Sequence, residues 1–178
     1  MPDAPAVLLI TGIQAAGKST VAQLVAEQLD RSVHLRGDQF RRMIIAGRAD
    51  MGPDADPEAV RQLRLRHQLT ASVADQYVQA GFTVVAQDIV LGEHLTDMVR
   101  WIRSRPLLVV VLAPEPAAVA AREAGRAKTA YGVYSVTDLD TALRRDTPRI
   151  GLWLDTTHQS PEQTATEILR RAPAEAAV

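Results

Sequence analysis

Short apolar segments alternate with amphipathic segments along the chain. Five apolar segments have the length of buried strands, and they cover residues 6–11, 32–35, 82–86, 107–112 and 150–154. The segments between them repeat apolar side chains every three or four residues, which is typical of helices. These predicted helices cover residues 18–29, 39–46, 58–80, 93–104, 115–125, 137–145 and 161–171. The alternation predicts an α/β fold in which a five-stranded parallel sheet lies between two helical layers.

The predicted elements follow one another without an internal repeat or a long linker. We therefore expect one domain over residues 1–172 and a disordered tail over residues 173–178. Hydrophobic residues make up 47% of the chain, but aromatic residues only 4%. The core should therefore be aliphatic, as in parallel sheets that are covered by helices on both faces.

A complete Gly-x-x-x-x-Gly-Lys-Ser motif joins the first predicted strand to the first predicted helix. Such a loop wraps its backbone N–H groups around phosphates, and the helix N-terminus adds a favourable dipole. Lys18 is expected to reach the β- and γ-phosphates, and the Ser19 hydroxyl to bind Mg²⁺. The motif predicts a site for a nucleoside triphosphate with Mg²⁺, formed by Gly12, Ile13, Gln14, Ala15, Ala16, Gly17, Lys18, Ser19 and Thr20.

Two aspartates follow predicted strands, Asp38 after the second and Asp88 after the third. Ligands of an open parallel sheet bind beyond the carboxyl ends of its strands, so both side chains are expected near the γ-phosphate. Phosphoryl transfer needs a carboxylate that holds or orients Mg²⁺ and a group that accepts the proton of the attacking hydroxyl. We assign Asp38 as this base and Asp88 to Mg²⁺ or to substrate orientation. The alternatives are a helix N-cap for Asp38 and a solvated loop carboxylate for Asp88.

Arg122 and Arg126 lie four residues apart at the end of a predicted helix, and this spacing places them on one helix face. In small-molecule kinases a mobile segment at this point brings arginines to the transferring phosphate. Both arginines are therefore candidate catalytic residues, with Arg122 also a nucleotide contact, and residues 122–135 are a candidate lid. The alternative is a pair of solvated surface arginines.

Other polar residues near the predicted carboxyl edge are candidates for ligand contacts. Arg41 and Arg42 follow Asp38 closely and are expected either to bind an anionic substrate or to be surface charges. Thr157 lies in the loop 155–158, where P-loop kinases often pass the adenine base. Because the sequence contains no Asn-Lys-x-Asp guanine signature, we expect ATP rather than GTP.

The charge balance and the cysteine count narrow the range of partners. The chain has 20 Lys and Arg against 21 Asp and Glu, which argues against a nucleic-acid partner bound through bulk charge. No apolar run approaches the ~20 residues of a membrane helix, and no signal-peptide pattern is visible, so we expect a cytoplasmic protein. The chain has no cysteine, which excludes thiolate catalysis. The oligomeric state stays open.

Four segments together resemble the chloramphenicol phosphotransferase-like family, within the wider group that includes shikimate, gluconate and adenylate kinases. They are the P-loop with its Gly-Lys-Ser, the Gly37-Asp38 pair, residues 88–92 (Asp-Ile-Val-Leu-Gly) and residues 155–158 (Asp-Thr-Thr-His). The resemblance implies a nucleoside-kinase-like P-loop fold, ATP and Mg²⁺, and a small hydroxylated acceptor that Asp38 deprotonates. It also implies phosphate and Mg²⁺ contacts at Lys18 and Ser19 and a lid at the candidate lid segment.

Two other functions stay open besides this phosphotransferase. A nucleoside or nucleotide kinase needs no strong base when its acceptor is a phosphate, so Asp38→Asn would then retain most activity, whereas loss of Arg41 or Arg42 would abolish acceptor binding. A nucleotide-binding regulatory switch would bind ATP without any turnover that an acceptor stimulates.

Overall fold

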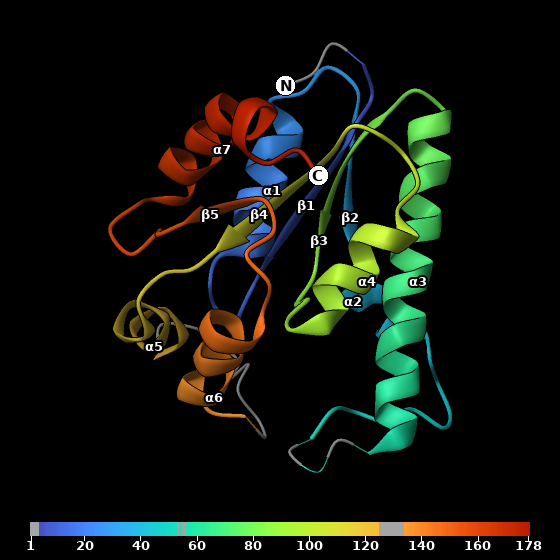
Figure 1. Cartoon of the computed structure of the whole chain (residues 1–178), viewed down its shortest axis with the longest axis vertical. Helices are drawn as coiled ribbons and strands as arrows, with labels where there is room; N and C mark the ends of the chain where they lie inside the picture. The colour runs from blue at the N-terminus through green and yellow to red at the C-terminus, as the bar shows by residue number, and fades with distance from the viewer. Residues whose placement is uncertain (1–3, 53, 55, 125–133) are drawn as a thin grey trace.

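A five-stranded sheet runs through the centre of the molecule (Figure 1). The computed structural model describes residues 4–52, 54, 56–124 and 134–178. The strands are β1 (Val7–Gly12), β2 (Ser32–Arg36), β3 (Thr83–Gln87), β4 (Leu107–Leu112) and β5 (Leu152–Leu154). Their order across the sheet is β2-β3-β1-β4-β5, and every neighbouring pair is parallel. The predicted five-stranded parallel sheet is therefore confirmed.

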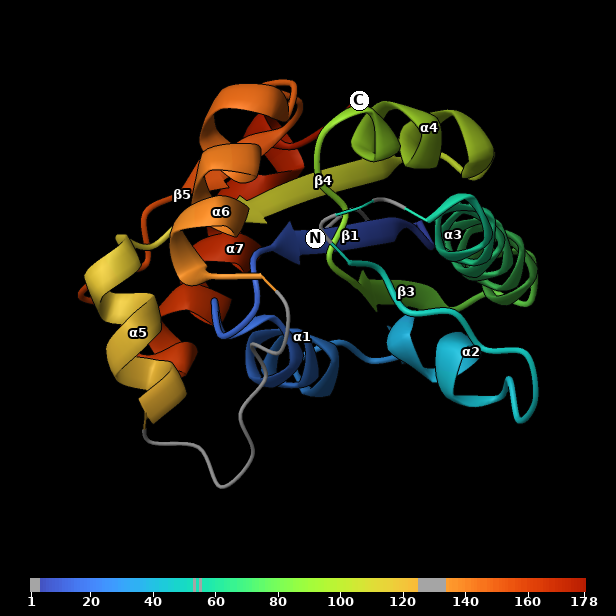
Figure 2. The ribbon, with the colours of Figure 1, turned by 90° about the horizontal axis from the view of Figure 1, so that it is seen from below.

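Helices cover both faces of the sheet and complete three layers (Figures 1 and 2). α1 and α7 pack together on one face, and α3 and α4 pack on the other. α5 and α6 lie at the carboxyl end of the sheet (Figure 1). The helices are α1 (Lys18–Glu27), α2 (Asp38–Arg42), α3 (Pro57–Gln79), α4 (Glu93–Trp101), α5 (Pro116–Ala124), α6 (Val136–Thr141), a π-helix η1 (Ala142–Asp146) and α7 (Pro161–Glu175).

The core is aliphatic, as the composition predicts. Every residue of β1 and β4 is buried, because these strands lie inside the sheet and helices cover both of its faces. Their apolar runs are therefore continuous and do not alternate with polar residues. In the described part of the chain, no helix combines the length and the apolar character needed to cross a bilayer.

The C-terminal ends of several predicted helices differ from what their sequence pattern indicates, and the helix expected over residues 93–104, for example, ends at Trp101. The helix expected over residues 39–46 stops at Arg42, because Met43 and Ile45 are 68% and 92% exposed and give the continuation no apolar face to bury. The helix expected over residues 137–145 is α-helical only to the end of α6 and continues as the π-helix η1.

The last residues form regular structure, which corrects the disordered tail expected over residues 173–178. α7 extends to Glu175, and the chain then returns to β4, where the Val109 N–H donates to the Ala176 carbonyl at 2.9 Å. β5 is shorter than the predicted 150–154 and pairs with the second half of β4. The first half of β4 therefore offers a strand edge, which the C-terminal residues meet through an antiparallel bridge.

Two histidines lie in contact between α3 and α4. The ring centroids of His67 and His94 are 5.6 Å apart, and His67 is fully buried. In the described part of the structure, neither ring nitrogen of His67 has a hydrogen-bond partner. Burial, helped by the nearby Arg66, lowers the pKa of His67 from 6.5 to about 3, although the Ile89 backbone opposes the shift. His67 is therefore neutral in the folded protein at physiological pH.

We expect His67 to make the fold sensitive to acid. Its folded pKa lies below its unfolded pKa, so between about pH 6.5 and about pH 3 the unfolded chain binds a proton that the folded chain does not. Stability should therefore fall as the pH falls, by up to about 1.4 kcal/mol per pH unit from this group. Urea unfolding at about pH 7.5 and about pH 5 measures the loss, and His67→Leu should lose less stability than the wild type.

His158→Leu is the matched control, because it removes an exposed histidine. We expect it to keep the pH dependence of the wild type. A pH dependence of the unfolding free energy that is unchanged in His67→Leu would contradict this account of His67.

Candidate active site

The carboxyl ends of three neighbouring strands bring the main sequence candidates together. The Asp88 N–H donates to the Ile10 carbonyl at 3.3 Å, which joins the end of β3 to the end of β1. The Gly37 N–H donates to the Gln87 carbonyl at 3.1 Å, which joins the end of β2 to the end of β3. Neighbouring strands lie about 4.8 Å apart, so the P-loop after β1, Asp88 after β3 and the start of α2 after β2 form one edge.

The P-loop between β1 and α1 has the backbone geometry of an anion cradle. The φ angle is positive at three positions, with 145° at Gly12, 60° at Ala15 and 97° at Gly17. A Cβ at Gly12 would lie 2.5 Å from the Leu112 carbonyl oxygen, so only glycine fits against β4 there. A left-handed alanine is uncommon, and such strain is often found at functional sites. The loop therefore turns its backbone as phosphate binding requires.

The side chains of the P-loop fit a triphosphate with Mg²⁺. Lys18 lies over the loop, is 8% exposed and donates from Nζ to the Ile13 carbonyl at 2.7 Å. Ser19 and Thr20 follow Lys18 in the first turn of α1 and are exposed. Within the loop itself, the side chains of Ile13, Ala15 and Ala16 are buried, and that of Gln14 is half-buried. An ammonium group held over a turned backbone, with a hydroxyl beside it, is the donor set that nucleotide phosphates and Mg²⁺ use.

Asp38 is the first residue of α2, and Gly37 takes the N-cap position, so Asp38 does not act as the N-cap. The Asp38 side chain is 27% exposed and pairs through Oδ2 with Arg42 Nη2 at 2.7 Å. Its Oδ1 lies 3.8 Å from Arg36 Nε. Among the described residues, this buried Oδ1 has no hydrogen-bond partner. Arg42 thus holds one oxygen of Asp38, and the other is buried without a hydrogen bond in the described part of the chain.

Asp88 is engaged by Arg66, a site residue that the sequence reasoning missed. Arg66 Nε donates to Asp88 Oδ2 at 2.6 Å, Arg66 Nη2 pairs with Oδ1, and the Ile89 N–H donates to Oδ1 at 2.7 Å. The Asp88 side chain is 2% exposed and that of Arg66 is 14% exposed. Arg66 lies four residues before the buried Thr70 on α3, and an arginine on the inward face of an amphipathic helix was the signal available in the sequence.

The two cationic candidates that follow Asp38 have different partners. Arg42 pairs with Asp38 itself, whereas Arg41 forms an ion pair with Asp50 in the connection between α2 and α3. Arg48 also lies 3.8 Å from the Asp50 carboxylate. The arginines therefore line the α2 side of the site, but Arg41 is partly neutralised by the loop.

Arg122 approaches the P-loop from α5. Its Nη2 donates to the Thr156 carbonyl at 2.6 Å, and its Nη1 donates to the Ala16 carbonyl at 3.5 Å. Arg122 therefore joins the P-loop to the loop after β5. Arg126 lies outside the described residues, as do residues 125–133 of the expected lid.

Thr157 supports the same loop from within. Its hydroxyl accepts a hydrogen bond from the Glu115 N–H at 2.8 Å and donates to Asp155 Oδ1 at 2.5 Å. These bonds hold the loop after β5 against the start of α5, next to the carbonyl that Arg122 contacts. In the described part of the chain, no three His, Cys, Asp or Glu side chains gather as a metal site.

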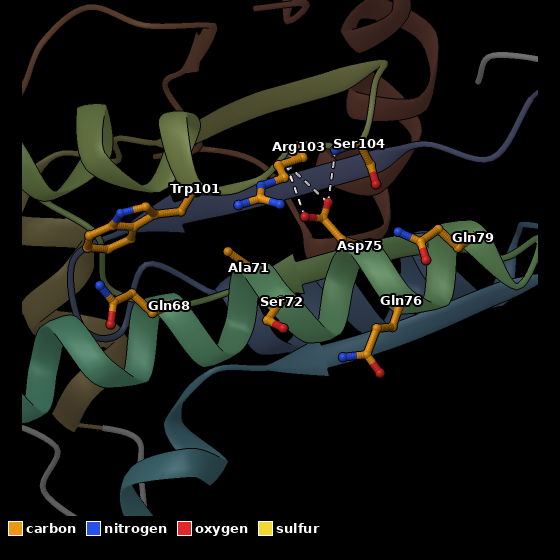
Figure 3. A pocket seen from close by; sticks show the side chains of 9 residues that line it. All are labelled: Gln68, Ala71, Ser72, Asp75, Gln76, Gln79, Trp101, Arg103 and Ser104. Carbon is orange, nitrogen blue, oxygen red and sulfur yellow. Dashed lines mark hydrogen bonds between the residues drawn. The ribbon is translucent and has the colours of Figure 1, made fainter.

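A groove of about 560 Å³ lies between α3 and the segment after α4, away from this edge (Figure 3). The Asp75 carboxylate accepts hydrogen bonds from the backbone N–H groups of Arg103 and Ser104 at 2.8 to 3.1 Å. Asp75 therefore fixes the connection that leads into β4. Because this connection precedes β4, the groove lies toward the amino ends of the strands and not at the P-loop.

The fold and the P-loop define a three-layer α/β/α protein of the P-loop NTPase class. A family model described as an AAA domain matches residues 7–150, which span β1 to the residue before Gly151. The chain belongs to this family. No curated protein matches the sequence.

Solved structures share the fold over almost the whole chain. The Mycobacterium tuberculosis APS kinase, in complex with AMPPNP and APS, is 20% identical with a TM-score of 0.70, over 95% of this chain and 98% of that chain. A sugar kinase from Janibacter sp. HTCC2649 is 20% identical with a TM-score of 0.68, over 94% and 93%. The Deinococcus radiodurans tunicamycin resistance protein is 15% identical with a TM-score of 0.70, over 98% and 99%. At these identities the likeness shows a P-loop kinase-like fold.

We expect Gly37→Ala to destabilise the protein. A Cβ at Gly37 would overlap Asp88 Oδ2 and lie 3.0 Å from Thr70 Oγ1. Such overpacking typically costs about 1–3 kcal/mol of unfolding free energy. Urea unfolding of Gly37→Ala, Asp88→Ala and the double variant measures the cost and its coupling. The cost of Gly37→Ala should shrink in the Asp88→Ala background, and an equal cost in both backgrounds would show that Asp88 is not the obstacle.

Proposed function

We propose that the protein is an ATP-dependent phosphotransferase that moves the γ-phosphate of Mg-ATP to a hydroxyl of a small molecule. The observation that carries this proposal is the buried Asp38 Oδ1, which has no hydrogen-bond partner among the described residues. It lies at the carboxyl edge that also holds the P-loop. A carboxylate oxygen that accepts no hydrogen bond from the described residues, at the same sheet edge as a phosphate cradle, is suited to accept a proton from an attacking hydroxyl.

The chemistry follows from the groups on each side of this edge. Asp38 accepts the proton of the acceptor hydroxyl, whose oxygen forms a bond to the γ-phosphorus while the bond from that phosphorus to the ADP oxygen breaks. Arg42 holds the other Asp38 oxygen, which fixes the carboxylate orientation. A base held in one orientation lowers the entropy cost of reaching the reactive geometry.

The nucleotide side of the site is the P-loop. Its backbone N–H groups and Lys18 bind the phosphates, and the Ser19 hydroxyl is a ligand for Mg²⁺. Mg²⁺, when bound, neutralises charge on the β- and γ-phosphates. Arg122 and Arg126 supply further positive charge to the transferring phosphate. Thr157 holds the loop that passes the adenine base.

In this proposal Asp88 orients the groups that bind the substrate and is not a direct ligand of Mg²⁺. Both of its oxygens accept hydrogen bonds or ion pairs from Arg66 or from the Ile89 N–H. A carboxylate with these partners positions Arg66 on the acceptor side. The other acceptor-side groups are Arg41 and Arg42.

The acceptor is an antibiotic or a metabolite with a hydroxyl group, as in the chloramphenicol phosphotransferase-like family that the sequence resembles. The structures of a sugar kinase and of a tunicamycin resistance protein on the same fold support a small hydroxylated molecule. We place this reaction in the cytoplasm, where ATP and Mg²⁺ are supplied.

Asp38→Asn tests the base directly. We expect it to lower acceptor-stimulated turnover by about 10²–10⁴-fold, because it removes general-base catalysis, and to leave the dissociation constant of ATP unchanged. The measurement is ADP release from Mg-ATP across a panel of hydroxylated antibiotics, sugars, sugar acids and nucleosides, with ATP binding measured by calorimetry. Asp30→Asn, which changes an exposed aspartate after α1, is the matched control and should behave as the wild type.

Each other result points to a different function. An Asp38→Asn variant that keeps most of its stimulated turnover would favour a nucleotide kinase, whose phosphate acceptor needs no strong base. Tight ATP binding without stimulation by any compound would contradict the phosphotransferase and favour a nucleotide-binding switch.

A further inference from the structure

Several arginines pair with aspartates on the side of the site formed by β2, α2, the loop after α2 and α3. Ion pairs join β2, α2, the loop after α2 and α3 on this side, and they involve five arginines but only three aspartates. The arginines are Arg36, Arg41, Arg42, Arg48 and Arg66, and the aspartates are Asp38, Asp50 and Asp88. The first four of these arginines have side chains that are 40–60% exposed, so solvent screens their charge, whereas the Arg66 side chain is 14% exposed.

Arg66 is the most buried of these arginines and is therefore the best candidate to bind an anionic group. Burial lowers the pKa of Arg66 to about 10, so it keeps its charge at neutral pH. The Asp38 charge opposes this lowering of the Arg66 pKa, and the Arg41 charge adds to it. The contact of Arg66 with Asp88 places its side chain at the end of β3 and not on the outer surface of α3.

The Arg66–Asp88 pair fixes the orientation of the guanidinium. Arg66 uses Nε and Nη2 on Asp88, so its fork is held from one side. The pair packs against Gly37, where no side chain separates it from the start of α2. A buried ion pair often adds little net stability. Two contacts with one carboxylate nevertheless restrict the rotation of the Arg66 guanidinium. These two contacts with Asp88 do not use Nη1.

We propose that Arg66, positioned by Asp88, forms a subsite for a carboxylate or phosphate of the acceptor, so that the substrate is an alcohol that also carries an anionic group. This inference rests on the proposed phosphotransfer. Asp38 accepts the proton of the hydroxyl of such a molecule. Arg66, at the end of the neighbouring strand β3, binds its anionic group. Arg66 binds substrate, and Asp88 is a positioning residue.

Matched acceptor pairs test the proposal on the wild-type protein. The pairs are glycerate with glycerol, gluconate with glucose, and phosphorylated with unphosphorylated nucleosides, each assayed for acceptor-stimulated ADP release. We expect stimulation by anionic members and not by their neutral partners. Equal stimulation by neutral partners would overturn the anionic subsite and leave the phosphotransferase standing. Binding of ATP without stimulation by either kind would contradict both proposals.

Variants of Arg66 then locate the subsite. Arg66→Gln should raise the KM for the anionic acceptor about ten- to hundredfold, as expected for loss of a hydrogen bond to a charged group, with the ATP dissociation constant unchanged. Arg64→Gln is the matched control, since it removes an exposed arginine of the same helix that pairs with Asp97, and its KM should stay at the wild-type value. An unchanged KM in Arg66→Gln would overturn the assignment.

A charge-neutral double variant separates the loss of anion binding from a loss of folding. Arg66→Gln alone leaves Asp88 as a buried and unpaired carboxylate, which destabilises a fold. Arg66→Gln with Asp88→Asn removes both charges, and circular dichroism verifies that it folds. We expect the same rise in acceptor KM in the folded double variant, and a wild-type KM there would again overturn the assignment.

Discussion

The parallel pairing of β1 with β3 and of β3 with β2 is the constraint on which the site depends. Parallel strands end at the same edge, so each residue that follows a strand is brought to that edge by the sheet hydrogen bonds. Two backbone bonds extend this pairing past the strands, from Asp88 to Ile10 and from Gly37 to Gln87. Main-chain geometry alone therefore brings together the P-loop, Asp88 after β3 and Asp38 after β2. Side-chain contacts are not needed for this arrangement.

In the proposed reaction, side chains divide this edge into a nucleotide side and an acceptor side. On the nucleotide side, Lys18 lies over the P-loop and Arg122 joins that loop to the loop after β5. On the acceptor side, Asp38 pairs with Arg42 and Asp88 pairs with Arg66. The transferring phosphate would pass between the two sides, which agrees with a reaction in which positioning and charge stabilisation do most of the catalytic work.

The sequence predicted the backbone of this arrangement better than its contacts. The strands, the P-loop and the places of Asp38 and Asp88 follow from apolar periodicity and from the rule that strand ends carry ligands. Arg66 was missed because helical spacing puts it on an inward face but does not tell which carboxylate it meets there. The C-terminal bridge to β4 was missed for a similar reason, since the vacant edge depends on how short β5 is.

The central claim is that the phosphate leaves ATP for an organic hydroxyl and not for water. Incubation of the protein with γ-labelled Mg-ATP and a mixture of hydroxylated acids, followed by separation of the products, tests it most directly. The account predicts label in an organic phosphate whose formation matches ADP release. Label found only in inorganic phosphate, at a rate that no acceptor changes, would contradict it.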